Sequence, residues 1–509
     1  MHNATQTLKE LLAGLKGCQV TGDDRIPVTD VAYHSQDVAP GSVFVALKGQ
    51  RTDGHRFLAA ALEKGARVIV SEQQLPPPPG VTVVRVPDAR LALAHLSAAF
   101  YRHPSRELKL VGITGTNGKT TTTYLLEAIM NAAGHQAGVV GTVNYRVGKR
   151  SWPAAVTTPE SLDLQRLLRE MRRHGASHVF LEVSSHALDL KRVDCAAFAA
   201  AVFTNLSQDH LDYHREMDSY FAAKSRLFLD LLAHGNSPGG TAVLNLDDPR
   251  GEELHRWVSV PTITYGSHPR SQVRPLAKRF KRLGLEARFA TPAGEVEIRS
   301  RLVGPFNLEN ILAATATALA LGLTLDDIAR GIAGLEGAPG RLERLGPPEG
   351  PAVFVDYAHT PAALASALKA LSALDFSRLI TVFGCGGDRD RSKRPLMGQA
   401  AAQASQLVVV TSDNPRSEDP LEIIKEIEAG LKAKNIPRVT AAAAKRGQTG
   451  YLVEPDRREA IRLAVKLAGP GDAILVAGKG HENYQIRGNE RLHFDDREEV
   501  QEALKENYG

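Results

Sequence analysis

Short apolar runs alternate with segments of helical periodicity from the start of the chain. The apolar runs are 43–47, 66–70 and 81–86, and the helical patterns are 57–64 and 89–101. Strands that alternate with helices indicate an α/β fold. The tetraproline at 76–79 belongs to a surface loop, because proline cannot continue a central strand. We predict a small N-terminal α/β domain over residues 1–107.

The next part of the chain contains apolar runs that are almost uninterrupted. They lie at 108–113, 178–183, 199–203 and 241–246. Such runs, separated by helices, are typical of a mostly parallel sheet that is buried on both faces. Ligands of these sheets bind beyond the carboxyl ends of the strands. We therefore predict a central domain over residues 108–339 whose ligand-binding residues follow the strands.

A third series of runs repeats the strand, loop and helix pattern. These runs are 352–355, 379–383, 407–410 and 473–476, and each ends in a polar loop. Gly- and Pro-rich stretches at 337–340 and 346–351 precede the series and predict a joint between domains. The predicted fold class is thus α/β with three domains, the last a Rossmann-like domain over residues 340–509.

A glycine-rich turn follows the first central strand and opens a helical segment. It consists of Gly115, Thr116, Asn117, Gly118, Lys119, Thr120 and Thr121. The glycines let backbone N–H groups point at phosphate oxygens, Lys119 can reach the outer phosphates, and the Thr120 hydroxyl can bind Mg²⁺. The general phosphate-loop pattern has a glycine where this chain has Ile113, so the loop is a variant. It predicts a nucleoside triphosphate site with Mg²⁺.

Polar residues follow two further central strands. Glu182 and His210 stand where they can complete a Mg²⁺ shell begun by Thr120. Each of them alone also fits a polar strand end without a ligand. Lys224 lies in a helical pattern, which by itself indicates a solvated charge. Asn307 is predicted to be the N-cap of a long alanine-rich helix.

The loops of the third series carry charges of both signs. Arg389 and Arg416 are expected at the same sheet edge as Asp413 and Glu482. Arginine binds carboxylates through two parallel hydrogen bonds and a carboxylate can bind an ammonium, so this edge suits a zwitterionic amino acid. The alternative is that Asn414-Pro415 begins a turn and the arginines form surface ion pairs.

Composition and charge narrow the function class only slightly. At 509 residues the chain is too long for one core, and 43% hydrophobic with 23% charged residues is ordinary for a globular protein. The first residues lack the pattern of a secretion signal and no apolar run has the length of a membrane span, so we expect a cytoplasmic protein without a membrane partner. The three cysteines have neither metal-ligand nor disulfide-framework spacing.

The net charge of +5 suits either nucleic acid or a substrate that carries several phosphates. The densest basic run, 270–282, contains one aromatic residue, Phe280, whereas binders of single strands usually present several. We interpret this run as a solvated face and expect no nucleic-acid partner. The chain is expected to be a monomer.

Four motifs together resemble the Mur ligases, in the same order and over essentially the whole chain. They are Gly115 to Thr121, Glu182-Val183-Ser184-Ser185-His186, Thr204-Asn205-Leu206 with Asp209 to His214, and Asp356-Tyr357-Ala358-His359-Thr360-Pro361. The resemblance also accounts for Ile113, since the loop of this family is the shorter form. Asp413-Asn414-Pro415-Arg416 is similar to the motif of members that add meso-diaminopimelate to UDP-N-acetylmuramoyl-L-alanyl-D-glutamate.

The resemblance implies a set of binding residues. ATP is expected at residues 115–121 with Asn307, Arg341 and Asp356. The UDP-linked substrate is expected at Ser35, Thr157, Thr158, Ser184 and Arg192, although Leu190 replaces a glutamine of some relatives. Diaminopimelate is expected at Arg389, Asp413, Asn414, Pro415, Arg416, Gly478 and Glu482. Lys224 matches a lysine that carries a carbamate, which would give Mg²⁺ a ligand beside Thr120, Glu182 and His210.

The activity implied by the resemblance is an ATP-dependent amide ligase that works through an acyl phosphate, with Lys119, Lys224 and His210 as catalytic residues. Closure of the third domain on the second is expected to assemble the site. Two related ligases stay open as alternatives, a lysine-adding homologue and an enzyme like folylpolyglutamate synthetase. A nucleotide-switched binding protein is a further alternative, although the chain lacks an Asn-Lys-x-Asp motif for guanine.

Overall fold

The computed structural model describes residues 6–49, 52–209, 211–233, 239–346 and 350–508. Their contacts divide the chain into two compact units. The first unit takes in residues 1–274, 291–294 and 312–331, and the second takes in 275–290, 295–311 and 332–509. His210 lies outside the described residues. Among the described residues, no helix is both long and apolar enough to cross a membrane.

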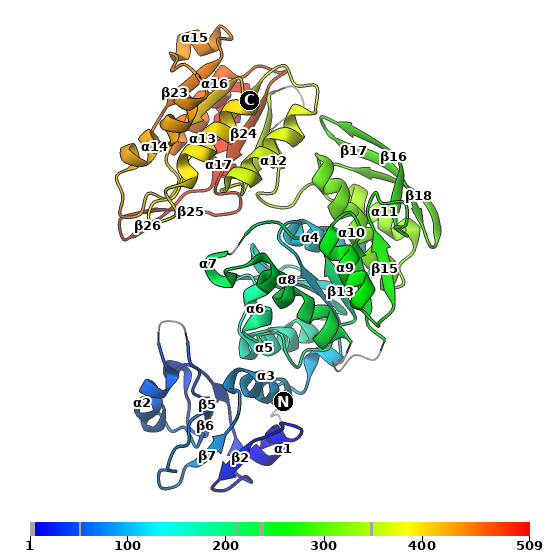
Figure 1. The fold of residues 1–509 in the computed structure, drawn as a ribbon, viewed down its shortest axis with the longest axis vertical. Coiled ribbons are helices and arrows are strands. Elements are labelled where there is room, and N and C mark those ends of the chain that lie inside the picture. Colours follow the sequence, from blue (N-terminus) through cyan, green and yellow to red (C-terminus); the bar gives the residue numbers. More distant parts are fainter. Residues whose placement is uncertain (1–5, 50–51, 210, 234–238, 347–349, 509) are drawn as a thin grey trace. The chain divides into compact units, whose positions relative to one another are not determined.

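The N-terminal part of the first unit, drawn in blue in Figure 1, contains a five-stranded sheet in the order β2-β7-β6-β5-β4. Its strands are β2 Gln19–Thr21, β7 Thr82–Arg85, β6 Val68–Ser71, β5 Val43–Val45 and β4 Val31–Ala32, and its helices are α1 Leu8–Leu12, α2 Leu58–Glu63 and α3 Ala89–Phe100. All pairs are parallel except β2 with β7. The predicted small α/β domain is therefore present.

The core of this N-terminal part includes a residue from beyond position 107. Leu162, on α5 (Ser161–Arg173), is buried in the same apolar cluster as Leu93 and Leu96 of α3. Polar contacts accompany it, because the Tyr33 hydroxyl donates to Asp163 Oδ2 at 2.6 Å and the Arg169 guanidinium donates to the Tyr101 carbonyl at 2.7 Å. The first two predicted domains thus share a packed contact.

An eight-stranded sheet forms the rest of the first unit, in the order β11-β10-β9-β12-β8-β13-β14-β15. The strands are β11 Arg150–Pro153, β10 Asn144–Val147, β9 Ala137–Val140, β12 His178–Glu182, β8 Lys109–Thr114, β13 Ala200–Phe203, β14 Thr241–Asn245 and β15 Thr262–Tyr265. From β9 to β15 every pair is parallel, and β10 and β11 add an antiparallel edge. The predicted mostly parallel central sheet is confirmed.

The register of this sheet brings the predicted strand ends together. Glu182 pairs with Ile113, and Phe203 pairs with Thr114. The residues that follow β8, β12 and β13 therefore leave the sheet at one edge. The surrounding helices are α4 Lys119–Ala132, α6 Ser185–Asp189, α7 Leu211–His214, α8 Met217–Arg226 and α9 Pro249–Trp257, and a π-helix, Leu227–Leu232, continues α8.

A three-stranded sheet precedes the C-terminal domain, in the order β16-β17-β18. Its strands are β16 Arg274–Lys281, β17 Gly284–Thr291 and β18 Gly294–Ser300, and the helices that follow are α10 Pro305–Ala320 and α11 Leu325–Gly334. The basic run falls on β16, whose middle residues are exposed. The predicted N-cap at Asn307 is wrong. Helix α10 already begins at Pro305, and the Asn307 amide instead donates to the Val303 carbonyl at 2.8 Å.

A six-stranded sheet forms the C-terminal domain, in the order β19-β20-β24-β21-β22-β23. The strands are β19 Glu343–Leu345, β20 Ala352–Asp356, β24 Ala473–Ala477, β21 Leu379–Phe383, β22 Leu407–Val410 and β23 Gly450–Val453, and the hairpin β25 Tyr484–Arg487 with β26 Glu490–His493 follows β24. Pairs from β20 to β23 are parallel and β19 is antiparallel. This is the Rossmann-like arrangement that was predicted.

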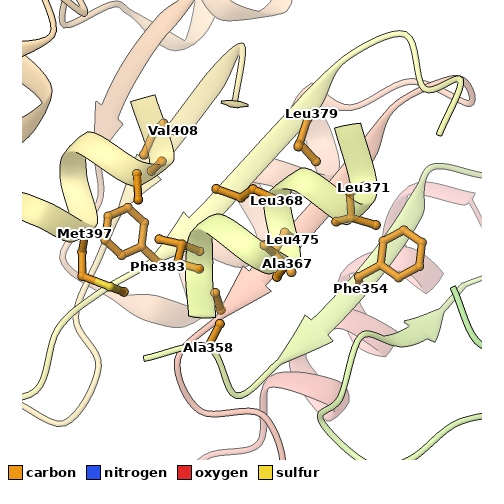
Figure 2. Close-up of a cluster of buried hydrophobic side chains, with 14 of the residues drawn as sticks. Phe354, Ala358, Ala367, Leu368, Leu371, Leu379, Phe383, Met397, Val408 and Leu475 are labelled. Carbon is orange, nitrogen blue, oxygen red and sulfur yellow. The ribbon is translucent and has the colours of Figure 1, made fainter. Parts of the chain in front are cut away.

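Helices cover both faces of this sheet. They are α12 Pro361–Ser372, α13 Lys393–Ala404, α14 Pro420–Ala433, α15 Ala441–Lys445, α16 Arg457–Leu467 and α17 Asp496–Tyr508. Phe354 packs in the cluster under α12, α13 and α14, part of which is shown in Figure 2, whereas its neighbours Val353 and Val355 pack under α16 and α17. Successive residues of a strand point to opposite faces, so each central strand needs apolar residues at nearly every position.

Candidate active site

The glycine-rich loop has the backbone that a phosphate-binding turn requires. The phosphate loop is defined here as residues 115–121, and it joins β8 to α4. Gly115 has φ +143° and Gly118 has φ +88°, a region that favours glycine. A Cβ at Gly115 would lie 1.9 Å from Thr204 Oγ1. Gly118 is the N-cap of α4, so the positive end of that helix opens at the loop.

The Lys119 side chain lies over the first residues of the phosphate loop. Its ammonium donates to the carbonyls of Gly115 and Thr116, both at 2.8 Å. The next strand also holds the loop, because Thr116 N donates to the Asn205 carbonyl at 2.8 Å and Asn117 N donates to Asn205 Oδ1 at 3.0 Å. A cation is thus placed at the helix N-terminus, where phosphate oxygens would be bound.

Glu182 collects hydroxyl groups beside the phosphate loop. The Thr120 hydroxyl donates to Glu182 Oε2 at 3.0 Å and the Thr142 hydroxyl donates to the same oxygen at 2.9 Å. Thr142 N donates to Oε1 at 3.0 Å, and a Cβ at Gly141 would lie 2.2 Å from that oxygen. Glu182 is only 1% exposed. A buried carboxylate surrounded by hydroxyl oxygens forms a set of hard donors.

Lys224 is buried, contrary to what its helical pattern alone indicates. Only 1% of the residue is exposed, and its ammonium nitrogen donates to the Gly115 carbonyl at 2.9 Å. Burial, and to a smaller extent the nearby Lys119 cation, hold the pKa of Lys224 well below its usual range. The Tyr220 ring lies 4.5 Å from Nζ, and its hydroxyl is 3.2 Å from Thr116 Oγ1. Burial therefore favours the neutral form of this amine, which lies close to the phosphate loop.

The residues expected to bind the UDP-linked substrate fall in two places. Thr158 donates to the Glu182 carbonyl at 2.8 Å and accepts from Ser184 N at 3.1 Å, and Arg192 donates to the Thr158 carbonyl at 3.1 Å. Thr157 joins them through the Thr142 hydroxyl at 3.1 Å. Ser35 is on a different element, the short helix Ser35–Asp37 of the N-terminal part. The structure brings four of these five residues together beside Glu182.

The second unit gathers a different group of side chains. The C-terminal cluster consists of Asp413, Asn414, Lys479 and Glu482, on the loops after β22 and β24. Asn414 Nδ2 donates to Glu482 Oε2 at 3.1 Å, and Lys479 Nζ donates to Asn414 Oδ1 at 3.1 Å. Burial raises the pKa of Glu482, and the negative charge of Asp413 raises it further. Gly478 has φ +119°, which lets the chain turn between the strand and these residues.

Two arginines lie beside one glycine of a neighbouring loop. A Cβ at Gly386 would lie 2.9 Å from Arg416 Nη1 and 3.7 Å from Arg389 Cγ. Arg416 donates to the Gly387 carbonyl at 2.7 Å and has φ +53°, while its backbone N–H donates to the Ile486 carbonyl at 3.1 Å. Pro415 is buried between Asn414 and Arg416. Arg389 is exposed, so its guanidinium is available to a ligand.

Arg341 and Asp356 also lie close together in the second unit. The guanidinium carbon of Arg341 is 4.8 Å from the centre of the Tyr357 ring. Asp356 accepts from Leu342 N at 2.7 Å and from Ala358 N at 2.8 Å. Burial raises the pKa of Asp356, and the positive charge of Arg341 opposes that rise. Asn307 is buried in α10 and accepts from Asn310 at 3.0 Å.

Sequence reasoning did not single out two residues that these networks contain. Thr142 completes the contacts of Glu182, and Lys479 contacts the C-terminal cluster. Thr142 carried no motif signal, whereas Lys479 stands between two glycines in a strand-end loop and could have been found there. In the described part of the chain, no three His, Cys, Asp or Glu residues form a metal-binding group.

Three models of known families match the chain. The Mur ligase middle domain matches residues 113–318, the Mur ligase, glutamate ligase domain matches 340–480, and the Mur ligase family, catalytic domain matches 27–101. The UDP-N-acetylmuramoyl-L-alanyl-D-glutamate–2,6-diaminopimelate ligase of Geobacter metallireducens is 48% identical over 502 residues, covering 98% of each chain. The chain belongs to the Mur ligase family. The resemblance inferred from its motifs is therefore confirmed.

Solved structures agree with the membership in the Mur ligase family. The structure of a UDP-N-acetylmuramoyl-L-alanyl-D-glutamate–2,6-diaminopimelate ligase has a TM-score of 0.73 and 32% identity, and the match covers 99% of this chain and 100% of that one. A folylpolyglutamate synthase of Mycobacterium tuberculosis, solved with ADP and AMPPCP, has a TM-score of 0.60 and 19% identity, over 77% and 92% of the two chains. That second likeness concerns the fold alone.

Proposed function

We propose that the chain is an ATP-dependent ligase that adds meso-diaminopimelate to UDP-N-acetylmuramoyl-L-alanyl-D-glutamate, a step of peptidoglycan precursor synthesis. The carrying observation is the C-terminal cluster, in which Asn414 contacts Glu482 beside Arg416. This group of carboxylates and an arginine suits one zwitterionic end of the amino acid. The 48% identical relative bears the name of this activity.

The first half of the reaction activates a carboxylate. The γ-phosphoryl group of ATP passes to the side-chain carboxylate of the D-glutamyl residue, forming an acyl phosphate and ADP. In this chain the N–H groups of the phosphate loop and the Lys119 ammonium stabilise the negative charge of the transferring oxygens. Lys119 now contacts two loop carbonyls, so we expect it to turn toward phosphate when ATP binds.

Mg²⁺ is the proposed cofactor of this half-reaction. Thr120 and Glu182 provide buried oxygen donors, which fit a hard cation. His210 and Lys224, as a carbamate, are the further proposed ligands. When bound, Mg²⁺ neutralises phosphate charge. Thr142, which donates to Glu182, would hold that carboxylate in place beside the loop.

Lys224 is proposed to carry a carbamate. Its neutral amine can attack the carbon of CO₂, forming an N–C bond and releasing one proton, and its burial favours the neutral form. Carbon-13 NMR of the protein equilibrated with labelled bicarbonate tests this modification. A bound carbamate signal that disappears in Lys224→Arg supports it. A wild-type protein without such a signal contradicts it.

The second half of the reaction forms the amide. An amine of diaminopimelate attacks the acyl phosphate, the C–N bond forms, and phosphate leaves as the amine loses a proton. The residues proposed to hold the amino acid are Arg389, Asp413, Asn414, Pro415, Arg416, Gly478 and Glu482. We propose that Asn307, Arg341 and Asp356 contribute to ATP binding. Ser35, Thr157, Thr158, Ser184 and Arg192 are the proposed contacts of the UDP-linked substrate.

ADP release measures the proposed reaction directly. The protein is given ATP, the UDP-muramoyl dipeptide and either meso-diaminopimelate or L-lysine. Release that depends on diaminopimelate supports the proposal. Equal turnover with both amino acids would remove the specificity assignment, and no turnover with either would remove the ligase assignment. Folate-dependent release would instead favour the folylpolyglutamate alternative. We further propose that the enzyme is a cytoplasmic monomer, and light scattering tests the oligomeric state.

A further inference from the structure

Lys479 is a fully buried lysine at the centre of the C-terminal cluster. Its relative exposure is 0%, and its ammonium lies 3.1 Å from Asn414 Oδ1, 3.5 Å from Asp413 Oδ1 and 3.7 Å from Glu482 Oε2. Taking an ammonium out of water costs several kcal/mol unless it is paired and hydrogen-bonded. These partners offset that cost, and all of them are among the residues proposed to bind the amino acid.

The charges of the cluster leave room for one further cation. Asp413 and Glu482 contribute two negative charges and Lys479 one positive charge, so the three residues carry one net negative charge. Asp413 is 9% exposed, and within the described residues its Oδ1 accepts no hydrogen bond. That oxygen lies 3.5 Å from Lys479 Nζ and keeps the capacity to accept a hydrogen bond from a second ammonium. Arg416 and Arg389, beside Gly386, are the matching cations for a carboxylate.

Lys479 also fixes the orientation of the Asn414 amide. Asn414 Oδ1 accepts from Lys479 Nζ and from Ile486 N, the latter at 3.0 Å. With its oxygen occupied by two donors, the amide must direct Nδ2 toward Glu482 Oε2, where the distance is 3.1 Å. Lys479 thus acts on both groups that face the substrate ammonium, through charge on Glu482 and through geometry on Asn414.

We propose that Lys479 is a specificity-determining residue that makes the C-terminal cluster select a zwitterionic amino-acid end over a lone ammonium. The proposal rests on the proposed function. Lys479 offsets the negative charge of one carboxylate. The remaining negative charge matches one substrate ammonium and is too small to bind a cation strongly by itself. The selection then depends on the carboxylate that the arginines receive. Meso-diaminopimelate ends in such a zwitterion, whereas the side chain of L-lysine ends in an ammonium alone.

The groups that set the pKa of Glu482 also connect it to Lys479. Lys479 and Asn414 lower the pKa of Glu482, against the larger effects of burial and Asp413. The charged and titratable surroundings of Glu482 also include Tyr484, whose ring centre lies 5.5 Å from Lys479 Nζ, Arg416, Tyr357 and the buried Arg457. Removal of the ammonium would leave two carboxylates to share a proton or to hold a second cation.

Steady-state kinetics of Lys479→Met and Lys479→Gln test the proposal. We expect the KM for meso-diaminopimelate to rise at least tenfold, while the KM for ATP changes less than twofold. The ratio of kcat/KM for meso-diaminopimelate to that for L-lysine should fall at least tenfold. Lys479→Arg keeps the charge and should retain the wild-type ratio within about threefold. Lys425→Met, which removes an exposed ammonium paired with Glu422 in the same domain, is the control.

Either of two results from the neutral variants would overturn the proposal. One is an unchanged ratio in Lys479→Met and Lys479→Gln, which would show that the charge is not needed. The other is an equal loss with every substrate and a lower melting temperature, which would show a merely structural role. If neither neutral variant folds, a changed ratio in Lys479→Arg is the overturning result. A wild-type enzyme inactive with both amino acids would remove the proposed function itself, and so the two failures are distinguishable.

Discussion

The two sites of this chain rely on different kinds of chemical group. The phosphate loop relies on backbone N–H groups, glycine conformation and threonine hydroxyls around Glu182. The C-terminal cluster relies on paired charges that are buried, with further pairs behind it. Arg457 and Asp496, both 0% exposed, are joined by two hydrogen bonds of 2.7 Å. The first site is formed mainly by main-chain conformation, and the second by the positions of charged side chains.

This difference corresponds to what each site must recognise. Phosphate is the same in every triphosphate, so a helix N-terminus with a short loop supplies most of what its binding needs, and the residues of that loop are adjacent in sequence. An amino acid is distinguished by its side chain, so its site needs charges at fixed positions from several loops. Arg457 connects two of these loops, because it donates to the carbonyls of Ala477 at 2.9 Å and Ser412 at 3.3 Å.

Removal of the loop cation should produce the largest effect. Lys119→Ala is expected to lower kcat by about ten-thousandfold, equal to about 5.5 kcal/mol, because the proposed role of Lys119 is to stabilise the negative charge of the transferring phosphoryl oxygens. Its melting temperature should stay near that of the wild type, since the ammonium donates to carbonyls of the loop itself, those of Gly115 and Thr116. ADP release and thermal melting check both parts. Exposed Lys109→Ala is the control, and a loss of less than tenfold in Lys119→Ala would contradict the assignment.

Breaking the buried ion pair should act on stability instead. Arg457→Met leaves the Asp496 carboxylate buried without its partner and should lower the free energy of unfolding by about 3–5 kcal/mol. Denaturant unfolding measures this change. Arg462→Met removes a partly exposed arginine from ion pairs with Glu459 and Glu506, and should cost about 1 kcal/mol or less. Similar losses in both variants would show that burial does not distinguish the pairs.

A conservative change at Arg416 should separate the two sites kinetically. Arg416→Lys keeps the positive charge but loses the planar fork that binds a carboxylate. The KM for meso-diaminopimelate should rise by about 10- to 100-fold, equal to about 1.4–2.7 kcal/mol. The KM for ATP should not change, because the phosphate loop is built from other residues. A parallel rise in both constants would argue against the separate roles.

Acid should weaken both units by a smaller amount. Burial lowers the pKa of His178, in the first unit, to about 4, and that of His481, in the second, to about 4. The unfolded chain binds protons at these residues near the ordinary value of 6.5, so it holds more protons than the folded chain between pH 6.5 and 4. The free energy of unfolding should therefore fall as the pH drops through this range.

Unfolding curves at several pH values measure that dependence. His178→Asn and His481→Asn should each make the stability less sensitive to acid, because the group that gains a proton on unfolding is gone. His255→Asn, at an exposed position, should keep the wild-type dependence. Stability that does not change between pH 6.5 and 4 in the wild type would contradict the prediction.

The sequence predicts the sheets and the strand-end loops well, for a physical reason. Strands buried on both faces need apolar residues throughout, so runs such as 199–203 and 407–410 stand out without tertiary information. The phosphate loop is also local. The burial of Lys224 was not visible in its helix pattern, because α8 has a helical periodicity of its own and the contact with Gly115 spans 109 positions. The prediction of an N-cap at Asn307 was wrong because the helix already begins at Pro305.

The buried position of Leu162 has a practical consequence for dissecting the protein. This leucine comes from the central part of the chain but completes the apolar core of the N-terminal part. A fragment that ends near residue 107 would therefore have a cavity in its core and an exposed apolar surface, and it would be prone to aggregate when expressed alone. The N-terminal part has its own sheet, yet it depends on its neighbour to fold as a stable body.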